Sequence, residues 1–155
     1  MEEEYRIETN FTEFRFSITD KGYDDCGYFW TDAVIAVSNQ WFYYKTSQKF
    51  LHFSEIIIIR DNLLKLLNDS IASDKKLEFI EPYIQIILKP KYDFRNDKRH
   101  IYIKEGYEIR DIIAEFLIYP TFDEVFTDQY YVLPLYREEI EGLVKYLSYM
   151  IEKLE

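Results

Sequence analysis

Few residues in this sequence are of the types that carry nucleophilic or metal chemistry. The chain of 155 residues has one cysteine, Cys26, and two histidines, His52 and His100. A cysteine beside a histidine can act as nucleophile and base, but a lone cysteine and two unlinked histidines are far more often structural. One cysteine also excludes an intramolecular disulfide, and two histidines exclude a three-histidine metal site. We therefore expect no catalytic residue of this kind and no cofactor.

Carboxylates are the remaining candidates for metal chemistry. The stretch DKGYDDCGYFWTD contains Asp20, Asp24, Asp25 and Asp32. Their spacing does not match a calcium-binding EF-hand loop, and no glutamate stands where that loop needs a bidentate ligand. The four glycines are scattered, so no phosphate-binding or dinucleotide-binding glycine loop can be assembled. The sequence therefore indicates neither a metal site nor a nucleotide site.

Glu81 and Pro82 interrupt two apolar runs in the stretch LEFIEPYIQIILKP. As a general acid, Glu81 would need a second carboxylate and burial that raises its pKa. Glu78 is three residues away, but on a strand this spacing places the two side chains on opposite faces. Proline cannot donate to a strand ladder, and it biases the preceding residue away from helix. The pair is therefore interpreted as a turn that breaks or bends the strand between Phe79 and Ile84.

The elements that position these residues begin with strands. The segments YRIE and TEFRFSI alternate apolar and polar residues, which is the period of a half-buried strand. The next segment, DKGYDDCG at 20–27, carries turn residues and predicts a loop. Residues 29–46 are rich in β-branched and aromatic side chains, with Asn39 and Gln40 as a turn or bulge.

The middle of the chain predicts a helix and then further strands. Ser54 is an N-cap residue that precedes a leucine-rich stretch, but the isoleucines at 56–59 leave the boundary open because β-branching favours strand. Asn68, Asp69 and Ser70 predict the exit loop. Strands are then predicted in three segments: residues 101–103, DIIAEFLIY at 111–119 and QYYVLPLY at 129–136. Pro134, in the last segment, indicates an edge strand or a bulge.

The C-terminal segment predicts an amphipathic helix. Glutamates occupy its first turn, where the helix dipole favours them. Its apolar residues form one continuous stripe, interpreted as a face packed on a sheet: Ile140, Leu143, Val144, Leu147, Ile151 and Leu154. The order of elements predicts an α+β fold in a single domain, 1–155, with a mainly antiparallel β-sheet on which the mid-chain and C-terminal helices pack.

The net charge of −10 limits the classes of partner. Such a chain is repelled by phosphate backbones, so we expect no nucleic-acid partner, and a cationic protein is favoured instead. Acidity is also an ordinary route to solubility. The N-terminal residues lack the basic segment and apolar run of a signal peptide, and no stretch approaches the roughly 20 apolar residues of a membrane span. We expect a cytoplasmic protein with no membrane contact.

Two motifs resemble a known family. FIEP at 79–82 and YREEIEGLVKYL at 136–147 stand in the same order of elements as in the WapI family of bacterial immunity proteins. The resemblance covers roughly residues 5–152. It implies an antidote that binds the C-terminal toxin domain of a secreted polymorphic toxin, often a nuclease, and neutralises it by occlusion. The resemblance also implies cytoplasmic residence, and it carries over no catalytic residue.

Two loops combine aromatic and acidic residues in the way that protein interfaces favour. Rigid rings supply contact area, and the acids meet arginine or lysine of a basic toxin. Ordinary loops with solvated acids would look the same. The candidate partner-binding residues are Asp24, Asp25, Tyr28, Trp30 and Asp32 in the first loop, and Phe122, Asp123, Glu124, Phe126 and Asp128 in the second.

Two other functions stay open. A small enzyme or ligand-binding domain would show a concave pocket with at least two carboxylates, or a tyrosine with a shifted pKa. A structural module would self-associate through exposed tyrosines.

Overall fold

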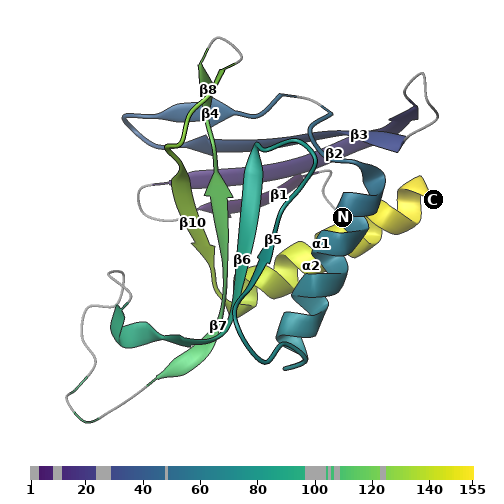
Figure 1. The fold of residues 1–155 in the computed structure, drawn as a ribbon. Helices are drawn as coiled ribbons and strands as arrows, with labels where there is room; N and C mark the ends of the chain where they lie inside the picture. Colours follow the sequence, from purple (N-terminus) through teal and green to yellow (C-terminus); the bar gives the residue numbers. More distant parts are fainter. Residues whose placement is uncertain are drawn as a thin grey trace.

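Two four-stranded antiparallel sheets form the framework of the fold (Figure 1). The first has the strand order β1-β2-β3-β4, with bounds Glu4–Glu8, Glu13–Tyr23, Phe29–Ser38 and Tyr43–Lys45. The computed structural model describes residues 4–8, 12–23, 29–47, 49–96, 104, 106, 109–122 and 125–155. This first sheet confirms the predicted strands and the turn at Asn39 and Gln40.

Alternation along β2 sets the inner face of the first sheet. Phe14, Phe16 and Ile18 are buried, as predicted. The predicted loop at 20–27 is wrong for its first residues, because β2 continues to Tyr23 beyond a register shift between Ile18 and Lys21. Pairing with the start of β3 satisfies the backbone there, so turn-type residues are held in a strand.

A tyrosine of the C-terminal helix reaches this bulge. The Ile18 N–H donates to the Tyr146 hydroxyl over 2.9 Å in a buried environment. Tyr146→Phe removes the acceptor and is expected to lower the free energy of unfolding by about 1–3 kcal/mol, the cost of a buried unsatisfied donor. Chemical denaturation measures this loss.

Tyr44→Phe is the matched control, because the buried Tyr44 hydroxyl has no hydrogen-bond partner among the described residues. We expect that variant to stay within about 0.5 kcal/mol of wild type. Equal losses in the two variants would contradict the role given to Tyr146.

The second sheet has the order β10-β7-β6-β5, with bounds Tyr131–Leu135, Arg110–Ile118, Ile84–Asp93 and Lys75–Leu77. Glu81 and Pro82 lie in the turn between β5 and β6, which confirms the turn interpretation. β10 is an edge strand, as Pro134 predicts, and the predicted inner face of β7 is buried. The strand predicted at 101–103 lies outside the described residues.

The remaining elements of the described residues are two helices, a short 3-10 turn and a two-stranded ribbon. Their bounds are α1 Phe53–Leu67, α2 Arg137–Leu154, η1 Phe94–Asn96, β8 Thr121–Phe122 and β9 Val125–Phe126. The isoleucines at 56–59 belong to α1, because Ile56 and Ile59 are buried at helical spacing with later leucines. Burial therefore outweighs their β-propensity.

The predicted N-cap of α1 is wrong by two residues. His52 is the N-cap, and its Nδ1 accepts a hydrogen bond from the Ser54 N–H over 3.2 Å. The exit loop is confirmed: Asn68 is the C-cap and Asp69 adopts φ 55°.

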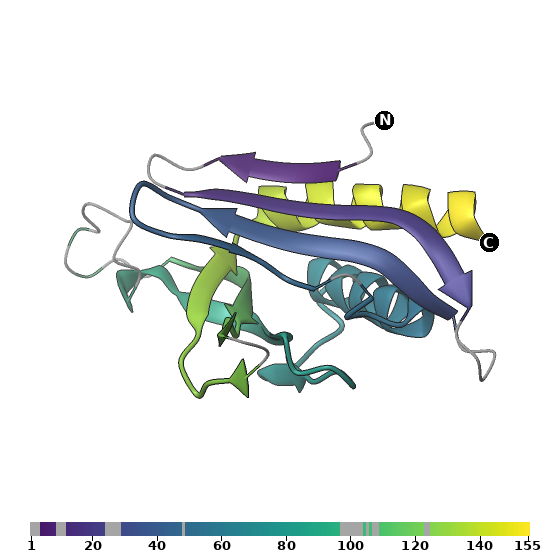
Figure 2. The same ribbon diagram turned by 90° about the horizontal axis from the view of Figure 1, so that it is seen from above.

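One hydrophobic core joins both sheets and both helices. Phe14 of β2 meets Phe116 of β7 edge to face, with ring centroids 5.9 Å apart. The predicted stripe of α2 is buried except at Leu154, which is half-buried, and α1 packs mainly along α2. The helices cover one face of the first sheet, and no helix of the described residues lies over its other face (Figure 2). The α+β class is confirmed, whereas the division into two sheets was not foreseen.

An ion pair links the second sheet to α2. Arg137 donates to both carboxylate oxygens of Asp111, with Nη2 2.6 Å from Oδ1. The hydrogen bonds from Arg137 hold the pKa of Asp111 below its ordinary value. Because the folded pKa is depressed, this stabilisation is present above the unfolded carboxyl pKa of about 3.9 and is lost as pH falls through the folded pKa.

Asp111→Asn is therefore expected to lower the melting temperature at pH 7, by the equivalent of at most about 1 kcal/mol because the pair is partly exposed. The difference from wild type should shrink as the pH falls below about 4, toward the depressed folded pKa of Asp111. Thermal unfolding followed by circular dichroism at pH 7 and at successively more acidic pH measures it. A difference that stays constant with pH would contradict the role of this ion pair.

Candidate partner-binding surface

The first predicted loop is only partly described. Asp24, Asp25 and Tyr28 lie outside the described residues. Trp30 lies in β3 and pairs with His52 across a β-bridge, and its ring meets the His52 ring edge to face at 5.6 Å. Trp30 is therefore partly buried against the beginning of α1, where its ring supports the fold.

The second predicted loop is also partly described. Asp123 and Glu124 lie outside the described residues, and for Phe122 only the backbone in β8 is described. Phe126 in β9 is 38% exposed, and its ring contacts the Tyr83 ring at 4.8 Å. Asp128 is exposed. This loop thus presents part of an aromatic ring and one described acid to solvent.

The described aromatics of the two loops do not touch one another. The Trp30 ring contacts His52, whereas the Phe126 ring contacts Tyr83, which in turn contacts Phe50. The segment Phe50–His52 therefore lies between them.

The open face of the first sheet carries charged side chains. Arg6 of β1 bridges Glu4, Glu8 and Glu13, and Arg15 pairs with Glu13. Of these, only the Arg6–Glu13 pair joins two strands, and the other pairs lie within one strand. All of them are at least partly exposed, so each adds little stability.

A hollow of about 260 Å³ opens on this face. Asp32, a predicted partner-binding residue, lines it. Neither its carboxylate nor the Lys45 ammonium makes an ion pair in the part of the chain that is described. The other lining residues are Glu4, Arg15, Ser17, Thr19, Val34, Ala36 and Tyr43.

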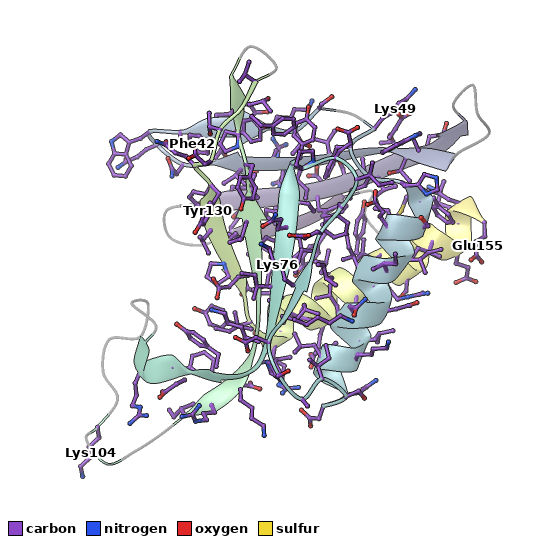
Figure 3. The ribbon with its side chains drawn as sticks, viewed as in Figure 1. Phe42, Lys49, Lys76, Lys104, Tyr130 and Glu155 are labelled. Atoms are coloured by element: carbon purple, nitrogen blue, oxygen red, sulfur yellow. The ribbon has the colours of Figure 1, made fainter. Side chains whose placement is uncertain are left out.

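A second hollow of about 260 Å³ lies beside the β3–β4 turn and is mainly apolar. The Phe42 ring stacks on the Tyr131 ring at 6.1 Å, which joins this turn to β10. The lining residues are Asn39, Phe42, Pro120, Thr127, Gln129, Tyr130 and Tyr131. Figure 3 shows Phe42 and Tyr130 near one another at this end of the molecule.

The residues most exposed around these hollows are not among those predicted from the sequence to bind a partner. Trp41 is 81% exposed, Tyr43 60% and Tyr130 51%. The sequence signal for this exposure was Trp41, which directly follows the Asn39–Gln40 turn. A large ring at the tip of a hairpin has few neighbouring residues to pack against.

The described residues do not bring a cysteine and a histidine together or form a metal-binding cluster. No group of three or more His, Cys, Asp or Glu side chains there is placed to hold a metal ion. His52 caps α1, while Cys26 and His100 fall outside the described ranges. Burial raises the pKa of Tyr5 to about 12, but its hydroxyl donates to the Glu139 carbonyl over 2.7 Å and is used in packing α2. Neither helix in the described part is long and apolar enough to cross a membrane.

Comparison with models of protein families shows the family to which this chain belongs. The model of the immunity protein WapI-like family matches residues 3–155. The chain belongs to this family. The match extends over both sheets and both helices, and it confirms the resemblance inferred from the FIEP and YREEIEGLVKYL motifs.

Comparisons with curated sequences and with solved structures give no further indication of function. Comparison with curated protein sequences gives no match. Among solved structures, the plant transcriptional regulator PBF-2 is 13% identical, with a TM-score of 0.47, covering 97% of this chain and 81% of that chain. WHY1 from Arabidopsis thaliana is 11% identical, with a TM-score of 0.42, covering 97% and 84%. These values are too low to transfer a function to this WapI-like protein.

Proposed function

We propose that this chain is a cytoplasmic immunity protein that binds a cognate toxin domain and neutralises it by occlusion, without catalysis. Membership of the WapI-like immunity family is the observation that carries the proposal. The net charge of −10 supports a basic toxin, such as a nuclease, and does not favour binding to nucleic acid itself.

The partner-binding residues of this proposal are those of the two acidic-aromatic loops. Among them, Trp30, Asp32, Phe126 and Asp128 are described. Asp32 and Asp128 have carboxylates that reach solvent, and Phe126 is partly exposed. Interfaces place such rings beside charges that meet the partner's arginines and lysines.

Titration of toxin activity tests the proposal. If a large secreted protein is encoded next to this chain, its purified C-terminal domain is assayed with increasing amounts of the chain. We expect inhibition that is complete at one equivalent of the chain. The chain itself should cause no covalent change in the toxin or in the toxin's substrate. Inhibition that grows with time at substoichiometric amounts would indicate an enzyme instead.

A second candidate function has one observation in its favour. Glu4 and Asp32 line the same hollow, as a carboxylate-based enzyme or ligand-binding domain requires. At about 260 Å³ the hollow is smaller than the roughly 300–1,000 Å³ of typical small-molecule sites. Nuclear magnetic resonance titration with small cationic metabolites tests this alternative, and shifts confined to the hollow would favour it over the immunity function.

A further inference from the structure

The tip of the β3–β4 hairpin holds its most exposed large side chain on a fixed backbone. The Asn39 N–H donates to the Phe42 carbonyl over 2.7 Å, and the Trp41 N–H donates to Asn39 Oδ1 over 2.9 Å. The indole above them is 81% exposed, more than any other large hydrophobic side chain in the described part of the chain. A rigid ring on an ordered turn loses little conformational entropy when a partner covers it.

This hairpin separates the two hollows. Tyr43 lines the hollow on the open sheet face, whereas Asn39 and Phe42 line the apolar one. The division follows from strand alternation, because Phe42 and Tyr44 turn toward the second sheet while Tyr43 faces outward. A partner seated on Trp41 therefore reaches a polar hollow on one side and an apolar hollow on the other.

The polar hollow contains a carboxylate that makes no ion pair among the described residues. Arg6 bridges Glu4, and Glu13 pairs with Arg15, but Asp32 keeps a carboxylate without an ion pair among the described residues. The exposed Tyr43 ring lines the same hollow. A guanidinium group suits either contact, since it pairs with carboxylates and stacks on aromatic rings. Because Tyr43 pairs with Ser38, far along β3 from Asp32, the two contacts would take separate basic groups. Lys45 offers a second contact, to an acidic group of the partner.

We infer that the β3–β4 hairpin is the centre of the toxin-binding surface, with Trp41 as its anchor and Asp32 as the contact for an arginine or lysine of the toxin. The partner is a basic protein domain that offers an apolar cleft to the indole. The inference rests on the proposed immunity function and names the surface that performs it. Of the predicted loop residues, Asp32 then belongs to the centre of the interface, whereas Phe126 and Asp128 lie at its margin.

Binding measurements on matched variants test the inference. The probe is the C-terminal toxin domain encoded beside this chain, carrying an inactivating substitution, and calorimetry gives Kd. Trp41→Ala is expected to weaken binding roughly 30-fold or more, as an anchor residue does. Asp32→Asn is expected to weaken it roughly tenfold, with a smaller dependence of Kd on salt concentration.

Two controls remove equivalent groups elsewhere. Ile80→Ala truncates another side chain that is 70% exposed, and Asp74→Asn removes an exposed carboxylate from the loop after α1. Both should bind like wild type. Circular dichroism checks that all four variants are folded.

The outcomes separate the two proposals. Tight binding by wild type that Trp41→Ala leaves unchanged would overturn the inference while the immunity function stands. Weakening by Trp41→Ala but not by Asp32→Asn would keep the anchor and overturn the assignment of a basic contact. Absence of binding by wild type to an expressed, toxic domain would overturn the proposed function and the inference with it.

Discussion

Replacement of Phe116 by alanine is expected to lower the free energy of unfolding by about 3–5 kcal/mol. The ring is fully buried in β7 and meets Phe14 of β2 edge to face at 5.9 Å, so it joins the two sheets. Truncation removes buried apolar area and leaves a cavity between two sheets that cannot close without moving their strands. Total stabilities are about 5–15 kcal/mol, so this loss is a large part of the whole.

Denaturant unfolding of Phe116→Ala and Phe116→Leu measures the effect. The leucine variant refills most of the volume and should lose less than about 2 kcal/mol. A loss below about 1 kcal/mol for Phe116→Ala would contradict the view that this contact joins the sheets.

Glu55→Ala is the second large expected loss, about 2–4 kcal/mol. The Glu55 side chain is buried at the first turn of α1. Oε1 accepts from the His52 N–H and Oε2 from the Ile80 N–H, each over 2.9 Å. The residue therefore completes the helix cap and also holds the turn that contains Glu81 and Pro82. Removing it leaves two backbone donors without acceptors.

Glu78→Ala is the matched control, because Glu78 is exposed and its one ion pair within the described residues is with the exposed Lys76. It should change stability by less than about 0.5 kcal/mol. Hydrogen exchange adds a local measure: loss of protection at Ile80 in Glu55→Ala is expected. Similar losses of stability in both glutamate variants would contradict the role assigned to Glu55.

The sequence patterns that predicted elements correctly were those with a complete period. The stripe of α2 and the alternation in β2 and β7 repeat over several turns or strand residues, so burial on one face is encoded locally. Pro134 predicted the edge strand, since a central strand has no place for a residue that cannot donate. Glu81 and Pro82 were predicted as a turn for the same reason, because Pro82 cannot donate a hydrogen bond to a neighbouring strand.

Features that depend on contacts between distant residues could not be predicted. Gly142 looks like a weakness in the middle of α2, yet a Cβ there would lie 2.9 Å from the Tyr5 hydroxyl oxygen of β1. His52 caps α1 although Ser54 has the higher cap propensity, because the bridge to Trp30 fixes the chain one residue before the helix. The split into two sheets likewise follows from pairings between strands far apart in sequence.

The candidate site likewise has one part that the sequence indicated and one part that depends on the fold. The composition of the two loops shows acids beside aromatic rings, and their role in partner binding stays a prediction. Trp41 was not predicted, because its place at an exposed hairpin tip between two hollows depends on the fold.

Growth rescue tests the central claim most directly. Bacteria expressing the C-terminal toxin domain encoded next to this chain are grown with and without co-expression of the chain, and the complex is isolated by an affinity tag on the toxin. We expect full growth only with the chain present, together with co-purification in equal amounts. Continued killing when both proteins are expressed and folded would contradict the assignment of this WapI-like protein as the antidote.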